Sequence, residues 1–260
     1  MDIHRRIKRR YERKPRTLHT MVPSHNKYFM SNSPLHIAII PDGNRRWAKA
    51  LSLMPWDGHQ KAVDNFQTLT EWCENDVRVG VLTVWCFSTE NWKRDPKEIR
   101  KLMHMLEDYL QKERSTFMKH NTRFLHSGRK DRIPASLKQL IADVEKETAH
   151  CDSFTLHLAV DYGGKDEILR AINKTKDSKE AQDSKEICET TIQNHLDQPS
   201  LPEIDLIIRT SGEHRTSNFF LWQSTYAEWD FIDKRFPDFT VKDLQSSVDS
   251  FAVRTRRFGG

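Results

Sequence analysis

The sequence has few cysteines and no long apolar run. Its four cysteines among 260 residues are scattered and form no C-x-x-C pair, which is typical of a reduced, cytoplasmic protein and predicts no zinc site. No stretch approaches the roughly twenty apolar residues of a membrane span, and no apolar core follows the basic N-terminal residues as in a signal peptide. We therefore expect a cytoplasmic protein whose only membrane contact is peripheral.

Glycine, proline and nucleotide-binding motifs are also scarce. The chain has 9 glycines and 10 prolines, too few for a low-complexity protein, and its apolar fraction of 37% suffices for a core. It contains neither a P-loop nor a G-x-G-x-x-G turn, which argues against a nucleotide-binding Rossmann arrangement. The length fits one domain of ordinary size with a tail.

Positive charge is concentrated at the N-terminus. Residues 1–16 hold eight of the 42 Lys and Arg but only two of the 37 Asp and Glu, which leaves 34 basic and 35 acidic residues elsewhere. This near-neutral remainder argues against a nucleic-acid partner. We interpret residues 1–34 as a flexible basic tail, although RNA or an anionic membrane surface are alternative uses for it. Residues 35–260 form the expected folded domain.

The stretch Leu35 to Ala48 joins a predicted buried strand to a predicted helix. We expect Asp42 or Asn44 to cap this helix. A strand that enters a helix through Gly43 presents backbone N–H groups and the positive end of a helix dipole, which suits phosphate. A carboxylate beside phosphate requires a bridging cation, so Asp42 also predicts Mg²⁺. The simpler interpretation, that Asp42 only caps the helix, stays open on this evidence.

The remaining pattern alternates strands and helices. A turn is expected at Trp56–His59, because of its glycine and position. Val79–Phe87 is a continuous apolar run typical of a strand buried on both faces of a parallel sheet. Together the pattern predicts an α/β domain with a central, mostly parallel sheet of about six strands and helices on both faces. Further expected strands are 122–127, 154–160 and 205–209, and expected helices are 61–75, 96–120 and 134–149.

Polar motifs follow two of these strands. Ser88–Arg94 comes directly after Phe87, and the loop that begins at Arg209 carries a second arginine, Arg215. Ligands of open α/β sheets bind at the carboxyl ends of strands, and paired arginines suit a diphosphate. The plain alternatives are a helix-capping loop after Phe87 and a structural ion-pair network with Glu213.

These stretches together resemble the signatures of the cis-prenyltransferases, the undecaprenyl and dehydrodolichyl diphosphate synthase family. HIAIIPDGNRRWA matches H-x-x-x-x-x-D-G-N-x-R-W-A, FSTENWKR matches F-S-x-E-N-W-x-R, and RTSGEHRTSNFFLWQSTYAE follows the family's R-T-x-G-E-x-R-x-S-N-F-x-L-W-Q-x-x-Y-A-E. The distance from Trp47 to His59 fits the family's G-H pair, and Asp161 stands where the family's N-Y-G-G turn has Asn. The resemblance spans about Leu35 to Gly260.

The resemblance implies a Mg²⁺-dependent homodimer that condenses isopentenyl diphosphate onto an allylic diphosphate such as farnesyl diphosphate, with a Z double bond at each addition. The D-D-x-x-D segments of the unrelated trans-prenyltransferases are absent. Peripheral membrane contact is expected for product release. The implied metal ligands are Asp42 and Glu228, and the implied catalytic residues are Asp42, His59, Ser88 and Asn91. The implied substrate-binding residues are Gly43, Asn44, Arg45, Arg46, Trp47, His59, Phe87, Ser88, Glu90, Trp92, Arg94, Arg209, Arg215, Ser217 and, from a partner copy, Gly259.

Two departures from the family pattern affect the expected affinity and the expected product. Pro55 stands where many bacterial members have a phosphate-binding arginine, and Arg45, in place of a common glycine, is expected to compensate. Cys86 occupies a position where small residues let the prenyl chain pass, and the 96–120 helix lacks the insertion of the longest-chain members. We therefore expect a medium-length, undecaprenyl-like product. Alternatives are a non-catalytic partner subunit, a short-chain or irregular prenyl synthase, and an RNA-binding protein that uses the basic arm.

Overall fold

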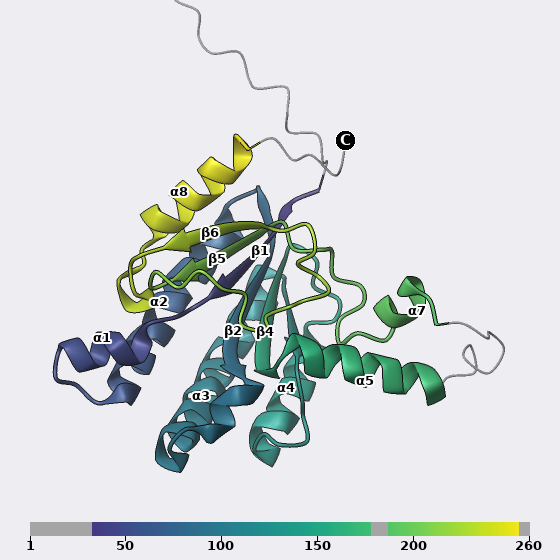
Figure 1. Ribbon diagram of the computed structural model, residues 1–260, viewed down its shortest axis with the longest axis horizontal. Helices are drawn as coiled ribbons and strands as arrows, with labels where there is room; N and C mark the ends of the chain where they lie inside the picture. Colours follow the sequence, from purple (N-terminus) through teal and green to yellow (C-terminus); the bar gives the residue numbers. More distant parts are fainter. Residues whose placement is uncertain (1–32, 178–186, 255–260) are drawn as a thin grey trace, which may run out of the picture. The chain divides into compact units, whose positions relative to one another are not determined.

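The computed structural model describes residues 33–177 and 187–254, and these described residues belong to one compact unit. Its centre is a six-stranded sheet in the order β3-β4-β2-β1-β5-β6, with every neighbouring pair parallel (Figure 1). The predicted α/β class and parallel sheet are therefore confirmed. Except for Ser33 and Pro34, the predicted tail lies outside the described residues. The strands are β1 (Leu35–Ile40), β2 (Val79–Ser88), β3 (Thr122–Ser127), β4 (Phe154–Tyr162), β5 (Leu206–Thr210) and β6 (Glu228–Ile232).

The helices connect these strands, and the predicted helices at 96–120 and 134–149 agree closely with the observed bounds. None that the structure describes is long and apolar enough to cross a membrane. The helices are α1 (Asn44–Ala50), α2 (Pro55–Asn75), α3 (Pro96–His120), α4 (Ala135–Glu147), α5 (Gly164–Asp177), α7 (Glu189–Gln193) and α8 (Val241–Ala252), with short 3-10 turns η1 (Thr89–Lys93) and η2 (Phe236–Asp238).

The prediction of a turn at Trp56–His59 is wrong, because α2 already begins at Pro55. Proline is favoured at the first position of a helix, where its missing N–H has no helical partner to lose. The Asp57 carboxylate accepts a hydrogen bond from the Met54 N–H (2.9 Å) and closes the helix start. This early start places His59 within the second turn of α2 rather than ahead of the helix.

Strand β6 was not predicted. All five of its residues are partly exposed, so the segment shows no buried apolar run that would signal a strand. Its conformation comes from pairing with β5, in which Leu206 lies opposite Glu228 and Thr210 opposite Ile232. Tertiary pairing therefore decides this strand, as is common at the edge of a sheet.

The two faces of the sheet are covered differently. On one face, apolar residues of the strands pack with those of α2, α3, α4 and α8 in the main core. On the other face, a smaller core joins β1 and β4 residues with Ile204, Phe219 and Phe220, and the Phe220 ring stacks on Tyr162 at 4.1 Å between centroids. The loop between β5 and β6 therefore packs on the sheet, and its ends are held in fixed positions.

The parallel register brings the ends of distant strands together. Ile40, the last residue of β1, lies opposite Arg209 of β5. The backbone N–H of Asp42 donates to the Thr210 hydroxyl at 2.9 Å, and this hydroxyl donates to the Asp42 carbonyl, also at 2.9 Å. The polar motifs that follow β1 and β5 thus meet at the carboxyl edge of the sheet, where parallel sheets place their ligands.

Candidate active site

The turn between β1 and α1 is built around Gly43. Its φ of 95° lies in the left-handed region, and an added Cβ would lie 2.5 Å from the Ser211 Oγ, so glycine is required. The predicted cap is wrong: Gly43 occupies the cap position and Asn44 is the first helical residue, without a side-chain cap. The Asp42 carboxylate is therefore free to make other contacts.

Three cationic or N–H donors surround the Asp42 carboxylate. Its Oδ1 accepts from the Gly43 N–H (2.7 Å) and from Arg46 Nη2 (3.1 Å), and its Oδ2 accepts from Arg209 Nη2 (2.9 Å). Burial acts to raise the pKa of Asp42, but the hydrogen bond and charge of Arg209, with Gly43 and Arg46, hold the pKa below its ordinary value. Asp42 is thus an ionised carboxylate at neutral pH.

Arg209 links the β5 end to the following loop. Its side chain is 4% exposed, and Nη1 donates to the Ser217 hydroxyl at 2.8 Å and to the Arg215 carbonyl. Its buried Nε has no hydrogen-bond partner within the described part of the chain. A buried guanidinium N–H without a partner costs free energy of folding. An acceptor such as a phosphate oxygen would satisfy the Arg209 Nε–H.

Arg46 and Arg215 share a single carboxylate. Arg46 Nη1 donates to Glu213 Oε1 at 2.7 Å, and Arg215 Nη1 donates to Glu213 Oε2. The hydrogen bond from Arg215, followed by that from Arg46, lowers the pKa of Glu213. The ion-pair network with Glu213, given above as the alternative interpretation, is therefore present, and it joins Arg46 of α1 to Arg215 of the loop after β5.

A second cluster lies around Glu98, near the start of α3. Glu98 is 4% exposed, and its Oε1 lies 3.2 Å from His59 Nε2, 3.4 Å from Arg94 Nη1 and 3.6 Å from Arg45 Nε. The hydrogen bond from His59 is the main cause that lowers the pKa of Glu98. Glu98 was not among the predicted site residues. The available signal was an acidic residue in the first turn of the predicted 96–120 helix, four residues after Arg94.

The two clusters share one polar cavity of about 280 Å³. It contains both the backbone of the β1–α1 turn and the cationic side chains of Arg45, Arg46 and Arg94, whereas Arg209 and Arg215 do not line it. The donor set is suited to an anion with several oxygens, such as a diphosphate. Its lining residues are Pro41, Asp42, Gly43, Asn44, Arg45, Arg46, His59 and Arg94.

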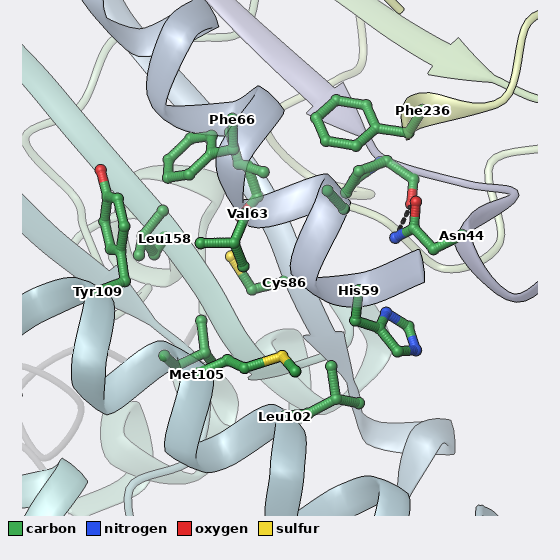
Figure 2. Close-up of a pocket in the computed structure, with 14 residues that line it drawn as sticks. Asn44, His59, Val63, Phe66, Cys86, Leu102, Met105, Tyr109, Leu158 and Phe236 are labelled. Carbon is green, nitrogen blue, oxygen red and sulfur yellow. Dashed lines mark hydrogen bonds between the residues drawn. The ribbon is translucent and has the colours of Figure 1, made fainter. Parts of the chain in front are cut away.

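An apolar cavity of about 70 Å³ begins where the polar cavity ends, and the two share Pro41, Asn44 and His59. Figure 2 shows Asn44 and His59 at one side of it and Phe66 and Tyr109 at the other. The Phe66 and Tyr109 rings are 5.1 Å apart between centroids and form part of its far wall. Cys86 lines its middle, and burial raises the pKa of this thiol to about 12, so the group is an uncharged wall residue.

Five predicted site residues of the Phe87–Arg94 segment line neither cavity, whereas Arg94 lines the polar one; the five are Phe87, Ser88, Glu90, Asn91 and Trp92. The Ser88 N–H donates to Asn91 Oδ1 at 3.1 Å, and Trp92 Nε1 donates to Asp161 Oδ1 at 2.8 Å. Phe87 is 1% exposed and contacts Trp92 edge-on at 5.1 Å between centroids. Glu90 accepts a hydrogen bond from Asn218 at 3.2 Å. The structure gives these predicted site residues mainly contacts with one another and with the neighbouring loops.

The two predicted metal ligands do not meet within this chain. Glu228 lies at the start of β6 and opposite Leu206, whereas Asp42 lies beside the end of β5. The Glu228 carboxylate accepts instead from Arg254 Nη1 at 3.2 Å. Among the described residues no group of three or more His, Cys, Asp or Glu side chains could hold a metal ion. Gly259, the predicted residue of a partner copy, lies outside the described residues.

One carboxylate still fits Mg²⁺ in a diphosphate site. This ion keeps several waters and usually takes one or two carboxylates together with substrate phosphate oxygens. Asp42 is ionised and lies in the same cavity as the phosphate-type donors. The residues present therefore fit a magnesium ion that arrives with a diphosphate.

Comparisons with known proteins agree with this arrangement. Residues 40–259 match the prenyltransferase family model for undecaprenyl diphosphate synthase. The isoprenyl transferase of Helicobacter pylori is 44% identical over 231 residues, which cover 88% of this chain and 98% of that protein. The isoprenyl transferase of Rhodopirellula baltica is 42% identical over 233 residues, which cover 88% of this chain and 94% of that protein.

Two crystal structures have the same fold. Lavandulyl diphosphate synthase from Lavandula x intermedia, in complex with dimethylallyl diphosphate, matches with a TM-score of 0.83 and 34% identity, over 87% of this chain and 98% of that chain. A protein from Campylobacter jejuni described as "a probable undecaprenyl diphosphate synthase" matches with a TM-score of 0.72 and 33% identity, over 88% and 100%.

Proposed function

The chain belongs to the undecaprenyl diphosphate synthase family of prenyltransferases, and we propose that it condenses isopentenyl diphosphate onto an allylic diphosphate of the farnesyl type. It is a prenyl-transferring enzyme by this membership. The observation that carries the finer assignment is the junction of a cationic polar cavity with an apolar cavity at His59 and Asn44. Such a junction suits a molecule with a diphosphate head and a hydrocarbon tail.

The chemistry requires stabilisation of a leaving diphosphate. A carbon–carbon bond forms between C1 of the allylic unit and the terminal methylene of isopentenyl diphosphate, while the allylic C1–oxygen bond breaks. C2 of the isopentenyl unit loses a proton, the electrons of that C–H bond form the new double bond, and diphosphate leaves with the electrons of the broken C–O bond. Arg46 and the N–H groups at the start of α1 face the polar cavity, where fixed donors stabilise developing negative charge.

Mg²⁺ would be held by Asp42 together with diphosphate oxygens, and when bound it supplies further charge neutralisation to the leaving group. The isopentenyl diphosphate would be held by Arg209, Arg215 and Ser217. The buried Arg209 guanidinium already donates to the Ser217 hydroxyl and so keeps the loop after β5 close to the end of that strand. His59, Ser88 and Asn91 would orient the homoallylic unit and accept its proton. We place Glu228 and Gly259 in the assembled site of a homodimer, with Gly259 of the partner subunit beside the diphosphate.

The expected product is a medium-length polyprenyl diphosphate, a precursor of a lipid carrier. We propose a cytoplasmic enzyme that touches the membrane peripherally when the product leaves.

The test is incubation of the purified protein with labelled isopentenyl diphosphate and farnesyl diphosphate, with Mg²⁺ or with excess chelator. Chromatography of the dephosphorylated products reads the chain length. We expect a Mg²⁺-dependent ladder that ends at one medium length and disappears in Asp42→Ala. Asp249→Ala, a change of an exposed carboxylate that pairs with Arg78, is the matched control. No product with geranyl, farnesyl or geranylgeranyl primers would contradict the proposal and indicate a non-catalytic partner subunit.

A second candidate is a short-chain or irregular prenyl synthase. The apolar cavity of about 70 Å³ is small and is bounded by Phe66 and Tyr109, and the lavandulyl diphosphate synthase structure is similar over 87% of this chain. The same assay separates the candidates, because a single short product from dimethylallyl diphosphate would replace the ladder.

A further inference from the structure

The turn between α1 and α2 exposes an unusual run of apolar side chains. Leu51 is 55% exposed, Leu53 44% and Met54 50%. In the part of the chain that the structure describes, the other exposed large apolar side chains are separated along the sequence, as at Val77 and Leu169. Single exposed apolar residues need no explanation, but a contiguous group marks an interaction surface.

The segment Leu51–Met54, called the apolar turn below, is held in place by its own hydrogen bonds. The N–H groups of Leu51 and Leu53 donate to the Ala48 carbonyl at 3.0 and 2.9 Å, and that of Ser52 donates to the Lys49 carbonyl at 3.1 Å. The Met54 N–H donates to the Asp57 carboxylate. All four backbone N–H groups are therefore satisfied within the protein, which lowers the cost of placing the segment where water is scarce.

Two lysines lie near this turn, one on α1 and one on α3. Helix α1 carries arginine and lysine but no acidic residue, and Lys49 is exposed in its last turn. From α3, the Lys101 ammonium lies 5.5 Å from the centroid of the Trp56 ring. The nearest acidic group in sequence, Asp57, already accepts the Met54 N–H. Apolar side chains, a tryptophan and lysines at one edge form the combination that binds the headgroup region of anionic bilayers.

The apolar turn also lies close to the candidate active site. Trp56 precedes His59 by one turn of α2, and Arg45, at the other end of α1, lines the polar cavity. A bilayer that contacted the turn would be within reach of the elements that bind the substrate's diphosphate.

We propose that the apolar turn, Leu51–Met54, inserts into an anionic lipid bilayer while Lys49 and Lys101 contact its headgroups. The inference deepens the proposed function and rests on it for the lipid character of substrate and product. A bilayer fits better than a protein partner, because the exposed group is a short protruding turn with a cationic rim and not a broad flat face.

The experiment is sedimentation of the full chain with vesicles of phosphatidylcholine containing phosphatidylglycerol, at about 0.15 M and 0.5 M salt. The test variant combines Leu51→Ser, Leu53→Ser and Met54→Ser. The matched control combines Val77→Ser, Leu169→Ser and Ile187→Ser, three exposed apolar positions elsewhere. We expect the test variant to bind vesicles at least tenfold more weakly at the higher salt, where attraction by the basic N-terminal residues is screened, and the control to bind like the parent.

A second readout locates the contact. Brominated lipids should quench tryptophan fluorescence of the parent, and Trp56→Phe should remove a distinct part of that quenching. Equal binding of test and control variants would overturn the proposal. So would a change of oligomeric state in the test variant alone, since that would assign the turn to a second copy of the chain.

The proposed function is tested separately on the same variants. With soluble farnesyl diphosphate in detergent, the test variant should retain condensation activity while it loses vesicle binding. If the parent binds vesicles through this turn but makes no product, the surface stands and the proposed reaction fails. If all variants make product and bind equally, the reaction stands and the surface fails.

Discussion

Arg209 Nη2 donates to Asp42 Oδ2 at 2.9 Å and so joins the ends of β1 and β5. The two residues are far apart in sequence, and the parallel pairing of Ile40 with Arg209 brings them together. The same guanidinium holds the Ser217 hydroxyl. One buried side chain therefore organises both the carboxylate proposed for Mg²⁺ and the loop proposed for isopentenyl diphosphate.

Arg209→Lys should lower kcat/KM by about a hundredfold, because a lysine keeps the charge but cannot reach Asp42 and Ser217 with one planar fork. Steady-state assay with both diphosphates measures the change. Arg114→Lys is the control: Arg114 forms a similar pair with Glu147, but both side chains are partly exposed. Its activity should stay within about twofold of the parent. Equal effects of the two changes would show that the Arg209 fork has no special role.

Arg45→Gly should raise the apparent KM for the allylic diphosphate about fivefold. This change corresponds to the loss of roughly 1 kcal/mol of binding free energy from one charge-assisted hydrogen bond. Arg45 lines the polar cavity, whereas Pro55, at the start of α2, carries no charge and is not among the residues that line it. Arg100→Gly places the same helix-weakening residue at an exposed position on α3 and should leave KM unchanged. The compensating role of Arg45 is refuted by an unchanged KM in Arg45→Gly.

Gly58→Ala should destabilise the protein by roughly 3 kcal/mol and reduce activity, since overpacking forces neighbouring atoms apart. An added Cβ would lie 2.1 Å from the Asn44 carbonyl oxygen, so α1 must move away from α2. Urea unfolding measures the loss. Gln60→Ala, at an exposed position two residues later, should change stability by less than about 0.5 kcal/mol. Unaltered stability of Gly58→Ala would contradict the close contact between the helices.

Stability should fall between pH 6.5 and about 4 because of buried histidines. Burial lowers the pKa of His36 from 6.5 to about 4, although the Pro202 carbonyl and Asp205 oppose this. Below pH 6.5 His36 becomes protonated in the unfolded chain but stays neutral in the folded protein. The stability that neutral, buried His36 contributes is therefore fully present above pH 6.5 and is lost as the pH falls toward 4. The loss reaches roughly 3 kcal/mol for this residue.

Urea unfolding at pH 7.5 and at pH 5 tests this prediction. His36→Gln should reduce the pH dependence, whereas His104→Gln, at a largely exposed site, should not. The proton uptake on unfolding of the parent protein at pH 5 gives an independent measure if His36→Gln folds poorly. A pH-independent free energy of unfolding in the parent would contradict the prediction.

The periodic apolar runs of the sequence determined the α/β class, five of the six strands and the full extent of α3. Local sequence was sufficient there because burial on both faces of a sheet demands a continuous apolar strand, and one buried helix face demands a repeat of three to four residues. The polar motifs also placed Asp42, Arg46 and Arg209 at one edge of the sheet, since parallel strands have their carboxyl ends there.

Only the tertiary structure decided the remaining features. Strand β6 forms because β5 offers it an edge, and Glu98 enters the site because α3 packs where His59 and two arginines converge. The structure likewise assigned the helix cap to Gly43 and turned the Asp42 carboxylate to the arginines. These outcomes depend on contacts between segments distant in sequence, whereas the apolar pattern and turn chemistry of each segment are local properties of the chain.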